Sequence, residues 1–271
     1  ELDRVTRAAI AALDGDETDA TQIKAAILQL TVHWPVYRSY AADGLPLGLR
    51  ARTALEDARR DSLPSHALGL VFNLLCAPDD PASRLFAARF EQLTGAITAK
   101  SEEDTVFFRS VAYLPFCEVG AQPKLEVIGS DALGKAMNAR ARYQPCALNA
   151  LSTHDTKRSA DARAALVALS YSPDLGARLW ATAREQAKAT GVSEGWGLYA
   201  MQTALILYRE PDAEMRMAEH IAKAMREAKT ESTHEMPDEA VEKRVADCAL
   251  SFMRALRSFV VWSTQERDDF E

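Results

Sequence analysis

The stretch CALNALSTHDTKR, which runs from Cys146 to Arg158, joins an apolar segment to a dense group of charged side chains. Its first half, Cys146–Leu151, is apolar and predicts a short buried strand. The charged run His154–Arg158 follows directly, ahead of a helical pattern. An α/β barrel places polar groups at its active face in this way, at the end of a strand. The pattern also fits a helix start capped by Ser152 or Asp155, with the basic side chains in solvent.

Outside this stretch, helical patterns dominate the sequence. Ala, Leu, Glu, Arg and Lys are abundant, and all of them favour helices. Strand-like runs are rare, and the other clear one is Val111–Val119. We predict helices over these segments: Arg4–Leu13, Thr21–Leu30, Leu49–Arg60, Ser65–Leu75, Pro81–Leu93, Ser101–Arg109, Asp131–Arg142, Asp161–Leu169, Ser172–Thr190, Trp196–Tyr208, Pro211–Lys229 and a last helix from Pro237. The chain is therefore expected to be mainly α.

The composition indicates which partners the chain does not bind and in which compartment it lies. The 271 residues carry a net charge of −7 and a pI near 5.4, which argues against nucleic acid and against an anionic membrane surface. The four cysteines are widely spaced and form no C-x-x-C pair, as expected for a reduced, cytoplasmic protein. No segment approaches the length of a membrane span or has the pattern of a signal peptide.

The sequence lacks the common metal and nucleophile motifs. His234-Glu235 has no second His one turn later, because position 238 is Asp. No His and Cys cluster has the spacing of metal ligands, and neither a Gly-x-Ser-x-Gly elbow nor a Gly-rich phosphate loop occurs. We therefore expect no metal and no cofactor.

A second charged cluster lies at Lys100–Asp104, and Phe107, Phe108 and Arg109 follow it. Acidic residues at a helix start interact favourably with the helix dipole, which would explain the cluster on structural grounds alone. The alternative is a sugar-binding edge, in which aromatic rings stack on sugars and charges bind hydroxyl groups.

Together the two clusters resemble the maltooligosyl trehalose synthase family of the α-amylase superfamily. The segment Ala147–Arg163, ALNALSTHDTKRSADAR, is similar to the last superfamily motif of that family. Further similar stretches follow in the family's order: Trp34–Tyr40 (WPVYRSY), Arg89–Arg109 (RFEQLTGAITAKSEEDTVFFR), Glu118–Gly120 (EVG), Leu198–Thr203, and Arg226–Lys229 (REAK) with Pro237. The resemblance spans most of the chain, from Trp34 to Arg257.

The resemblance implies a reaction and a set of site residues. The family converts the reducing-end α-1,4 bond of a maltooligosaccharide into an α,α-1,1 bond by intramolecular transglucosylation, with retention. Asp155 would be the third catalytic carboxylate, which holds and distorts the reacting sugar, and His154 would bind the hydroxyl groups of that sugar. The other substrate-binding residues implied are Lys157, Arg158, Lys100, Glu103, Asp104 and Arg109.

The nucleophile and the acid/base of the family lie in motifs upstream of the similar stretches, and no matching motif occurs in this sequence. A retaining mechanism needs both carboxyl groups. The isolated chain is therefore expected to be inactive without a partner that supplies the N-terminal barrel half of the same enzyme.

Three positions depart from the family pattern. Ser101 stands where Gly is expected, Phe108 where Tyr is expected, and Cys117 where Asn is expected. The changes at Phe108 and Cys117 would each remove a hydrogen-bonding group from the side that faces the sugar. We therefore expect weakened substrate affinity.

The predicted fold is mainly α, with helical bundle-like regions around a few short strands that are the remnant of an incomplete (β/α)8 barrel. Residues 1–110 would form a helical insertion region, residues 111–160 the last barrel strands with the His-Asp motif, and residues 161–271 a C-terminal helical region. Helices or a partner chain would cover the unpaired strand edges.

Two other functions remain open at this point. The chain could be a non-catalytic helical module that binds glucan or protein and has diverged from the family. It could also be a piece of an ordinary α-amylase or glucanotransferase, although those enzymes share only the His-Asp core of this pattern.

Overall fold

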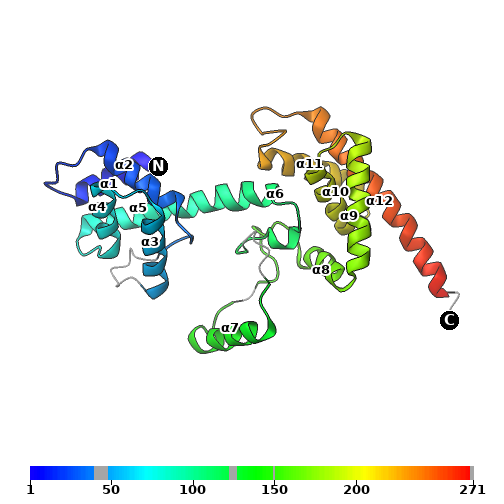
Figure 1. Cartoon of the computed structure of the whole chain (residues 1–271), viewed down its shortest axis with the longest axis horizontal. Helices are drawn as coiled ribbons and strands as arrows, with labels where there is room; N and C mark the ends of the chain where they lie inside the picture. Colours follow the sequence, from blue (N-terminus) through cyan, green and yellow to red (C-terminus); the bar gives the residue numbers. More distant parts are fainter. Residues whose placement is uncertain (40–47, 122–126, 149, 269–271) are drawn as a thin grey trace. The chain divides into compact units, whose positions relative to one another are not determined.

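The computed structural model describes residues 1–39, 48–121, 127–148 and 150–268. Within these residues the chain is all-helical (Figure 1). The helices form two compact units, Glu1–Glu102 and Glu103–Glu271. The predicted division into residues 1–110, 111–160 and 161–271 stays a prediction.

The first unit packs five helices around one apolar core: α1 (Leu2–Ala12), α2 (Ala20–Val32), α3 (Leu49–Asp61), α4 (His66–Cys76) and α5 (Pro81–Thr98). α5 begins at a capping box, in which the Asp80 carboxylate accepts from the backbone N–H of Ser83 and the Ser83 hydroxyl accepts from the N–H of Asp80. Pro81 follows at the first turn, as predicted. In the core, the rings of Trp34 and Phe90 meet edge to face at 5.2 Å.

A π-helix, η1 (Ala99–Val106), continues α5 and leads into α6 (Phe107–Arg109). The second unit also contains two short 3-10 turns, η2 (Leu114–Phe116) and η3 (Leu169–Tyr171). Its longer helices are α7 (Ser130–Tyr143), α8 (Ala160–Ala168), α9 (Pro173–Thr190), α10 (Glu194–Leu207), α11 (Ala213–Ala228) and α12 (Glu239–Asp268).

Helix α10 is the centre of the second unit. Every residue from Trp196 to Ala204 is buried, and α10 packs against α8, α9, α11 and α12. A helix that is apolar on all sides has this kind of surrounding in a globular core. The small side chains of α9 allow a close approach, because a Cβ added at Gly197 would lie only 2.5 Å from the Cβ of Ala187.

Replacing Gly197 by Ala is therefore expected to lower the free energy of unfolding by about 2 kcal/mol, as overpacked cores do. The measurement is the midpoint of thermal unfolding of the second unit. Gly134→Ala on α7 is the matched control, because nothing lies within 4 Å of a Cβ at that position. A Gly197→Ala protein as stable as the Gly134→Ala protein would contradict the close packing of α9 on α10.

The two predicted strands are absent from the described residues. Val111–Val119 forms a loop and the 3-10 turn η2. The described residues of Cys146–Leu151 are irregular, and Asn149 lies outside the described residues. The prediction of barrel strands is therefore wrong for this structure. The backbone N–H and C=O groups of a strand need hydrogen-bond partners on a neighbouring segment. Here the Gln202 side chain of α10 takes that place, since it accepts from Leu114 N–H at 2.9 Å and donates to the Val111 carbonyl at 2.8 Å.

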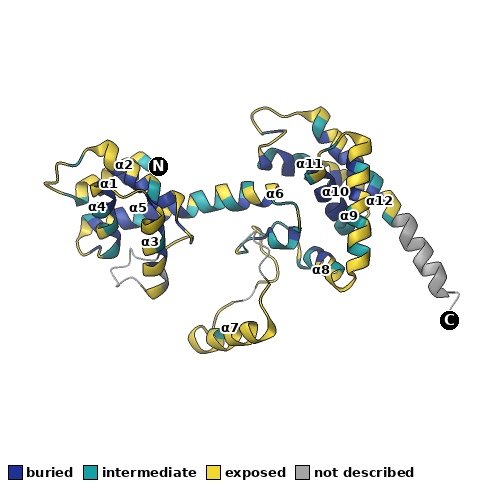
Figure 2. Cartoon of the chain, viewed as in Figure 1, coloured by how far each residue is buried: buried dark blue, intermediate teal, exposed yellow. Residues whose placement is uncertain are grey.

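Helix α7 and the segments beside it are exposed (Figure 2). No residue of α7 is buried. Large apolar side chains in the same part of the chain are also open to solvent, among them Val127 at 89%, Leu148 at 95% and Leu151 at 76% exposure. So many exposed apolar side chains in one segment are typical of a surface that another polypeptide covers.

Candidate functional site

A tight turn at Thr153–Thr156 forms the most exposed part of the predicted site. The Thr156 backbone N–H and hydroxyl both donate to the Thr153 carbonyl, at 3.2 and 2.8 Å. The Asp155 N–H donates to the Thr153 hydroxyl at 3.3 Å. Threonine hydroxyls stabilise turns of this kind by bonding to the nearby backbone. The turn therefore presents the two central residues, His154 and Asp155, outward.

His154 and Asp155 form an ion pair in solvent when the imidazole is protonated. Nε2 of His154 lies 3.3 Å from Oδ2 of Asp155, and the side chains are 91% and 68% exposed. Such exposed pairs contribute little to stability. Both side chains are therefore free to bind a ligand without loss of the fold. The catalytic role of Asp155 stays a prediction.

Glu118 holds the chain immediately after this turn. Its carboxylate is buried and accepts three backbone hydrogen bonds, from Lys157 at 2.7 Å, Arg158 at 3.0 Å and Val119 at 2.9 Å. Arg163 of α8 lies 3.8 Å from the same carboxylate. Hydrogen bonds to a charged acceptor are about twice as strong as neutral ones. Glu118 therefore fixes where the His-Asp turn leaves the body of the unit.

The two predicted clusters meet in one ion pair. Nζ of Lys157 lies 2.7 Å from Oδ1 of Asp104, and the side chains are only 15% and 26% exposed. Asp104 is on the π-helix η1, and π-helical turns often occur at functional sites. The Lys157 ammonium also lies 5.8 Å from the ring centre of Phe108. The structure thus brings residues from the two halves of the predicted site into contact.

The remaining predicted site residues are not gathered around Asp155. Arg158 is buried and donates from Nη1 to the Cys117 carbonyl at 3.1 Å. Arg109 donates from Nε to the Ala228 carbonyl at the end of α11, at 2.6 Å. Glu103 is buried on η1, and Lys100 is exposed on the first turn of the same helix. Their roles in substrate binding stay predictions.

The expectation that Phe108 and Cys117 face the sugar is wrong. Phe108 is only 5% exposed and lies in the core of the second unit. Cys117 is fully buried, and its thiol donates to the Ser110 carbonyl at 3.0 Å. Burial raises the pKa of that thiol above its ordinary value. Phe108 and Cys117 therefore do not lie on a sugar-facing surface. Ser101, the third position that departs from the family pattern, is exposed.

Sequence reasoning also missed the role of Glu118 and the use of Ser159 as the cap of α8. Ser159 Oγ accepts from the Ala162 N–H at 3.2 Å. Ser152, one of the two candidate caps besides Asp155, accepts from the N–H of Ala160, the first residue of the same helix. The signal for Glu118 was its place in the EVG stretch, but nothing in that stretch showed that its partners lie near residue 157.

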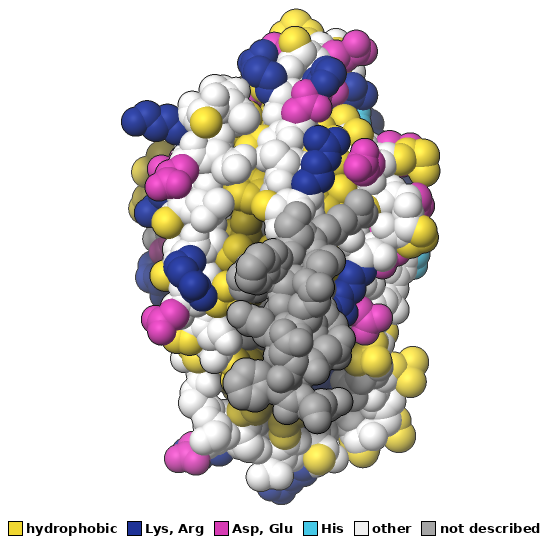
Figure 3. All heavy atoms as spheres, turned by 90° about the vertical axis from the view of Figure 1, so that its right-hand side faces the viewer, with side chains coloured by type: hydrophobic (Ala, Val, Ile, Leu, Met, Phe, Trp, Pro, Cys, Tyr) yellow, Lys and Arg dark blue, Asp and Glu magenta, His cyan; other side chains and the backbone are white. Residues whose placement is uncertain are grey.

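The described residues contain no group of three or more His, Cys, Asp and Glu side chains that could hold a metal ion. In the same part of the chain, no helix is long and apolar enough to cross a membrane. On the face drawn in Figure 3, the described basic and acidic side chains are interspersed and do not gather by sign.

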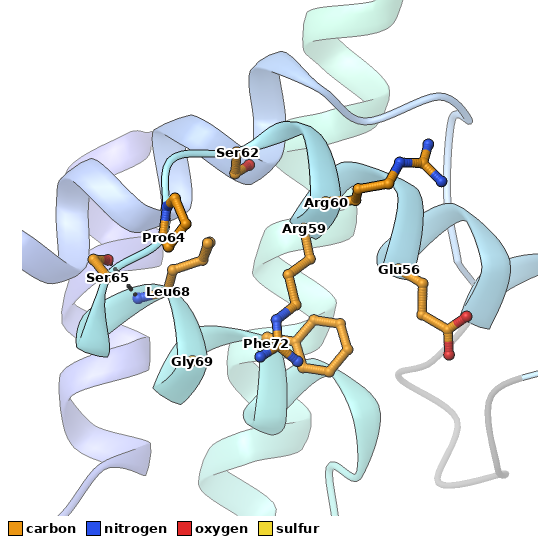
Figure 4. A pocket seen from close by; sticks show the side chains of 9 residues that line it. All are labelled: Glu56, Arg59, Arg60, Ser62, Pro64, Ser65, Leu68, Gly69 and Phe72. Carbon is orange, nitrogen blue, oxygen red and sulfur yellow. Dashed lines mark hydrogen bonds between the residues drawn. The ribbon is translucent and has the colours of Figure 1, made fainter.

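The first unit has a separate cavity of about 600 Å³ between α3 and α4. Figure 4 shows that Arg59 lies against Phe72 there, and the guanidinium carbon is 4.3 Å from the ring centre. The Ser65 hydroxyl caps α4 by accepting from the Leu68 N–H. Among the described residues that line this cavity, Phe72 has the only aromatic ring, and Arg59 covers one face of it, so that face is not free to stack on a sugar.

The stretch REAK at Arg226–Lys229, part of the family resemblance, contributes to the packing of α11 on α12. Arg226 of α11 donates two hydrogen bonds to the buried Glu242 of α12, both at 2.7 Å. Ser232 donates to the same carboxylate at 2.5 Å. These hydrogen bonds, that of Arg226 first, hold the pKa of Glu242 below its ordinary value of 4.5. The pair joins α11 to α12.

The depressed pKa of Glu242 predicts how stability depends on pH. The stabilisation is fully present above pH 4.5 and is lost as the pH falls through the lower pKa of the folded state. Glu242→Gln is expected to cost about 2 kcal/mol at neutral pH and to flatten the acid limb of the stability curve.

Urea unfolding between neutral and acid pH measures both effects. Asp247→Asn is the matched control on the same helix, because its partner Lys243 is exposed and such pairs contribute under about 1 kcal/mol. An acid limb that is the same in the Glu242→Gln and Asp247→Asn proteins would contradict the role of Glu242.

Comparison with known proteins places the chain among relatives of one enzyme. No family model matches it. A protein of Mycobacterium tuberculosis (strain H37Rv), named as a maltooligosyl trehalose synthase, is 34% identical over 162 residues, which are 59% of this chain and 21% of that protein. The structure of maltooligosyltrehalose synthase from Arthrobacter ramosus matches with a TM-score of 0.73 at 28% identity, over 94% of this chain and 33% of that chain.

A maltooligosyl trehalose synthase structure from Sulfolobus tokodaii, described as hypothetical, matches with a TM-score of 0.68 at 20% identity. It covers 98% of this chain and 37% of that chain, and at this identity it shows the fold alone. The 162 aligned residues of this chain cover about a fifth of the length of the curated relatives that it matches. It is homologous, in sequence and in structure, to about a third of maltooligosyl trehalose synthase.

Proposed function

We propose that this chain acts as one part of an enzyme that converts the reducing-end α-1,4 bond of a maltooligosaccharide into an α,α-1,1 bond, by intramolecular transglucosylation. The observation that carries the proposal is the homology to about a third of maltooligosyl trehalose synthase. The anchored turn at Thr153–Thr156 supports it, since this turn presents a histidine and a carboxylate together to solvent.

In this proposal His154 and Asp155 are the groups that touch the sugar. Asp155 would bind the hydroxyl groups of the reacting glucose and favour its distorted ring, and His154 would donate to a neighbouring hydroxyl. Retaining transfer passes through a positively charged, oxocarbenium-like transition state. A carboxylate close to that charge would stabilise it. Lys157, Asp104 and Glu118 would position the turn rather than bind the sugar.

The proposal assigns the nucleophile and the acid/base to another polypeptide segment, the N-terminal barrel half of the same enzyme. Retaining enzymes hold these two carboxyl groups only about 5–5.5 Å apart. Neither family motif occurs in this sequence. The exposed apolar side chains Val127, Leu148 and Leu151 support the presence of such a partner segment, because a barrel half packed there would cover them.

A second candidate function is binding of glucan without catalysis. It is favoured by an apolar cavity of about 600 Å³ in the second unit, whose lining includes Tyr113, Phe116 and Trp180. Aromatic rings in a cavity are common partners of sugar rings. If maltohexaose changes the fluorescence of the chain, and Trp180→Leu abolishes the change, this second function is supported.

Incubation of the purified chain with maltohexaose tests the main proposal. Loss of reducing ends without release of glucose would report formation of the α,α-1,1 bond. We expect no loss with the isolated chain, since the nucleophile and the acid/base are supplied by its partner. Loss of reducing ends catalysed by the isolated chain would contradict the assignment of those groups to another segment.

A further inference from the structure

Arg163 of α8 contacts the chain on both sides of the turn that carries His154 and Asp155. On one side, its Nη2 donates to the Leu151 carbonyl, just ahead of the turn. On the other side, its Nη1 lies 3.8 Å from Oε2 of Glu118, whose carboxylate accepts from the backbone N–H groups that follow the turn. One guanidinium group therefore joins the two ends of the turn.

Hydrogen bonds from the start of α8 attach the chain ahead of the turn. Besides the contact between Arg163 and Leu151, the N–H of Ala160, the first residue of α8, donates to the Ser152 hydroxyl at 3.0 Å. The Leu151 side chain is 76% exposed, so apolar packing contributes little to this attachment. The position of the chain at Leu151 and Ser152 therefore depends mainly on these two hydrogen bonds.

A buried carboxylate attaches the chain after the turn. The Glu118 side chain is only 7% exposed, and it accepts from the N–H groups of Lys157 and Arg158 at 2.7 and 3.0 Å. Burial of a carboxylate is costly unless a cation and hydrogen bonds compensate for the lost water. Arg163 forms an ion pair with this carboxylate. It therefore stabilises the acceptor that holds both amides.

The shape of the guanidinium group suits these two contacts. Its donors lie in one plane at fixed angles, so the groups bound at Nη1 and Nη2 are held at a fixed spacing. A lysine ammonium is a compact point charge, which can pair with Glu118 but does not fix a second group at a set distance. A glutamine amide carries no charge for this pair. The substitutions Arg163→Lys and Arg163→Gln therefore separate the effect of the charge from the effect of the planar fork.

We propose that Arg163 is a positioning residue for the proposed transglucosylation. It holds the chain before and after the turn at one spacing, and so it fixes where the Asp155 carboxylate and the His154 imidazole stand. It acts through Leu151 and Glu118 and does not bind the sugar itself. A small displacement of a catalytic group is enough to lower a rate. The effect on catalysis rests on the proposed function, whereas the effect on the turn does not.

Hydrogen exchange in the full chain measures the effect on the turn. The Ala160 amide reports the attachment ahead of the turn, and the Lys157 amide reports the attachment after it. Arg163→Gln is expected to raise the exchange rates of both amides about tenfold. Arg163→Lys is expected to restore the protection of the Lys157 amide but not that of the Ala160 amide, because it keeps the charge and loses the fork.

Two controls separate loss of position from loss of structure. The Leu166 amide lies within α8, its side chain is fully buried, and its exchange rate is expected to stay unchanged. Arg184→Gln on α9 removes the cation of an exposed ion pair and is expected to leave all three amides protected. The proposal is overturned if the Ala160 and Lys157 amides stay protected in the Arg163→Gln protein. It is also overturned if the Leu166 amide accelerates as much as they do, since α8 would then be unfolding.

Kinetics measure the effect on catalysis in an enzyme that joins this chain to a barrel half with a nucleophile and an acid/base. Arg163→Lys is expected to lower kcat about tenfold and to change KM less than about threefold, because the displaced carboxylate acts mainly on the distorted sugar. Arg184→Gln should leave both constants unchanged. If the enzyme without substitutions forms no α,α-1,1 bond, the proposed function fails, and the exchange rates alone decide whether Arg163 holds the turn. If that enzyme is active and neither Arg163→Lys nor Arg163→Gln lowers kcat, Arg163 is not a positioning residue.

Discussion

Replacing Glu118 by Ala is expected to raise the hydrogen-exchange rates of the Lys157 and Arg158 amides by about a hundredfold. Each hydrogen bond to a charged acceptor contributes about 1.5–3 kcal/mol, and about 1.4 kcal/mol corresponds to a factor of ten. Glu118 is the acceptor for both amides, at 2.7 and 3.0 Å. Without it these N–H groups lose their partner, and the turn that carries His154 and Asp155 is released from the body of the unit.

Two variants serve as controls for this prediction. Glu118→Gln keeps one acceptor oxygen and is expected to give an intermediate exchange rate. Glu185→Ala removes an exposed carboxylate from α9 and is expected to leave both amides protected. Exchange at Lys157 and Arg158 in the Glu118→Ala protein that matches the unsubstituted protein would show that the turn is held by other contacts.

Replacing Asp155 by Asn is expected to lower kcat at least about a hundredfold in an enzyme that joins this chain to a barrel half with a nucleophile and an acid/base. Removal of one group that stabilises charge in a transition state commonly has an effect of this size. The loss should lie mainly in kcat, because the carboxylate acts on the distorted sugar more than on the ground state. The side chain is 68% exposed in the chain alone, so the substitution should leave the fold unchanged.

The control for Asp155→Asn is Asp247→Asn on α12, which removes an exposed carboxylate outside the motif and outside residues 127–151. Thermal unfolding of both variants checks that neither loses its fold. If Asp155→Asn and Asp247→Asn reduce kcat equally little, Asp155 is not a catalytic residue.

Most helices of the chain follow from local signals in the sequence. Asp80 and Pro81 predict the start of α5, and in the structure Asp80 caps this helix and Pro81 lies in its first turn. Gly191 predicts the end of α9, where it has a φ of 66° that other residues rarely adopt. The helices predicted over Trp196–Tyr208 and from Pro237 correspond to α10 and α12, and both contribute to the core of the second unit. Caps and periodicity act within a few residues, so a single sequence is enough to read them.

The absence of the two predicted strands from the described residues could not be inferred from local signals. An apolar run such as Cys146–Leu151 has the composition of a strand, but a strand forms only when a neighbour completes its hydrogen bonds. In this chain Val111 and Leu114 bond instead to the side chain of Gln202, about ninety residues later in the sequence. Long-range contacts of this kind leave no local pattern.

The site was predicted in part. The two charged clusters were found from the sequence, and in the structure the ion pair between Lys157 and Asp104 joins them. The inward direction of Arg158 was not predicted, because neighbouring residues in a turn can point in opposite directions. The π-helix that presents Asp104 was not predicted either, since its residues have the composition of an ordinary helix.

One fusion protein tests the central claim most directly. The third of the Arthrobacter ramosus enzyme that this chain matches is replaced by this chain, and the folded fusion protein is incubated with maltohexaose. The claim predicts a non-reducing product, whose α,α-1,1 linkage is identified by NMR, and its absence when Asp155 is replaced by Asn. A folded fusion protein that leaves every reducing end of maltohexaose intact would contradict the claim that this chain is a working part of such an enzyme.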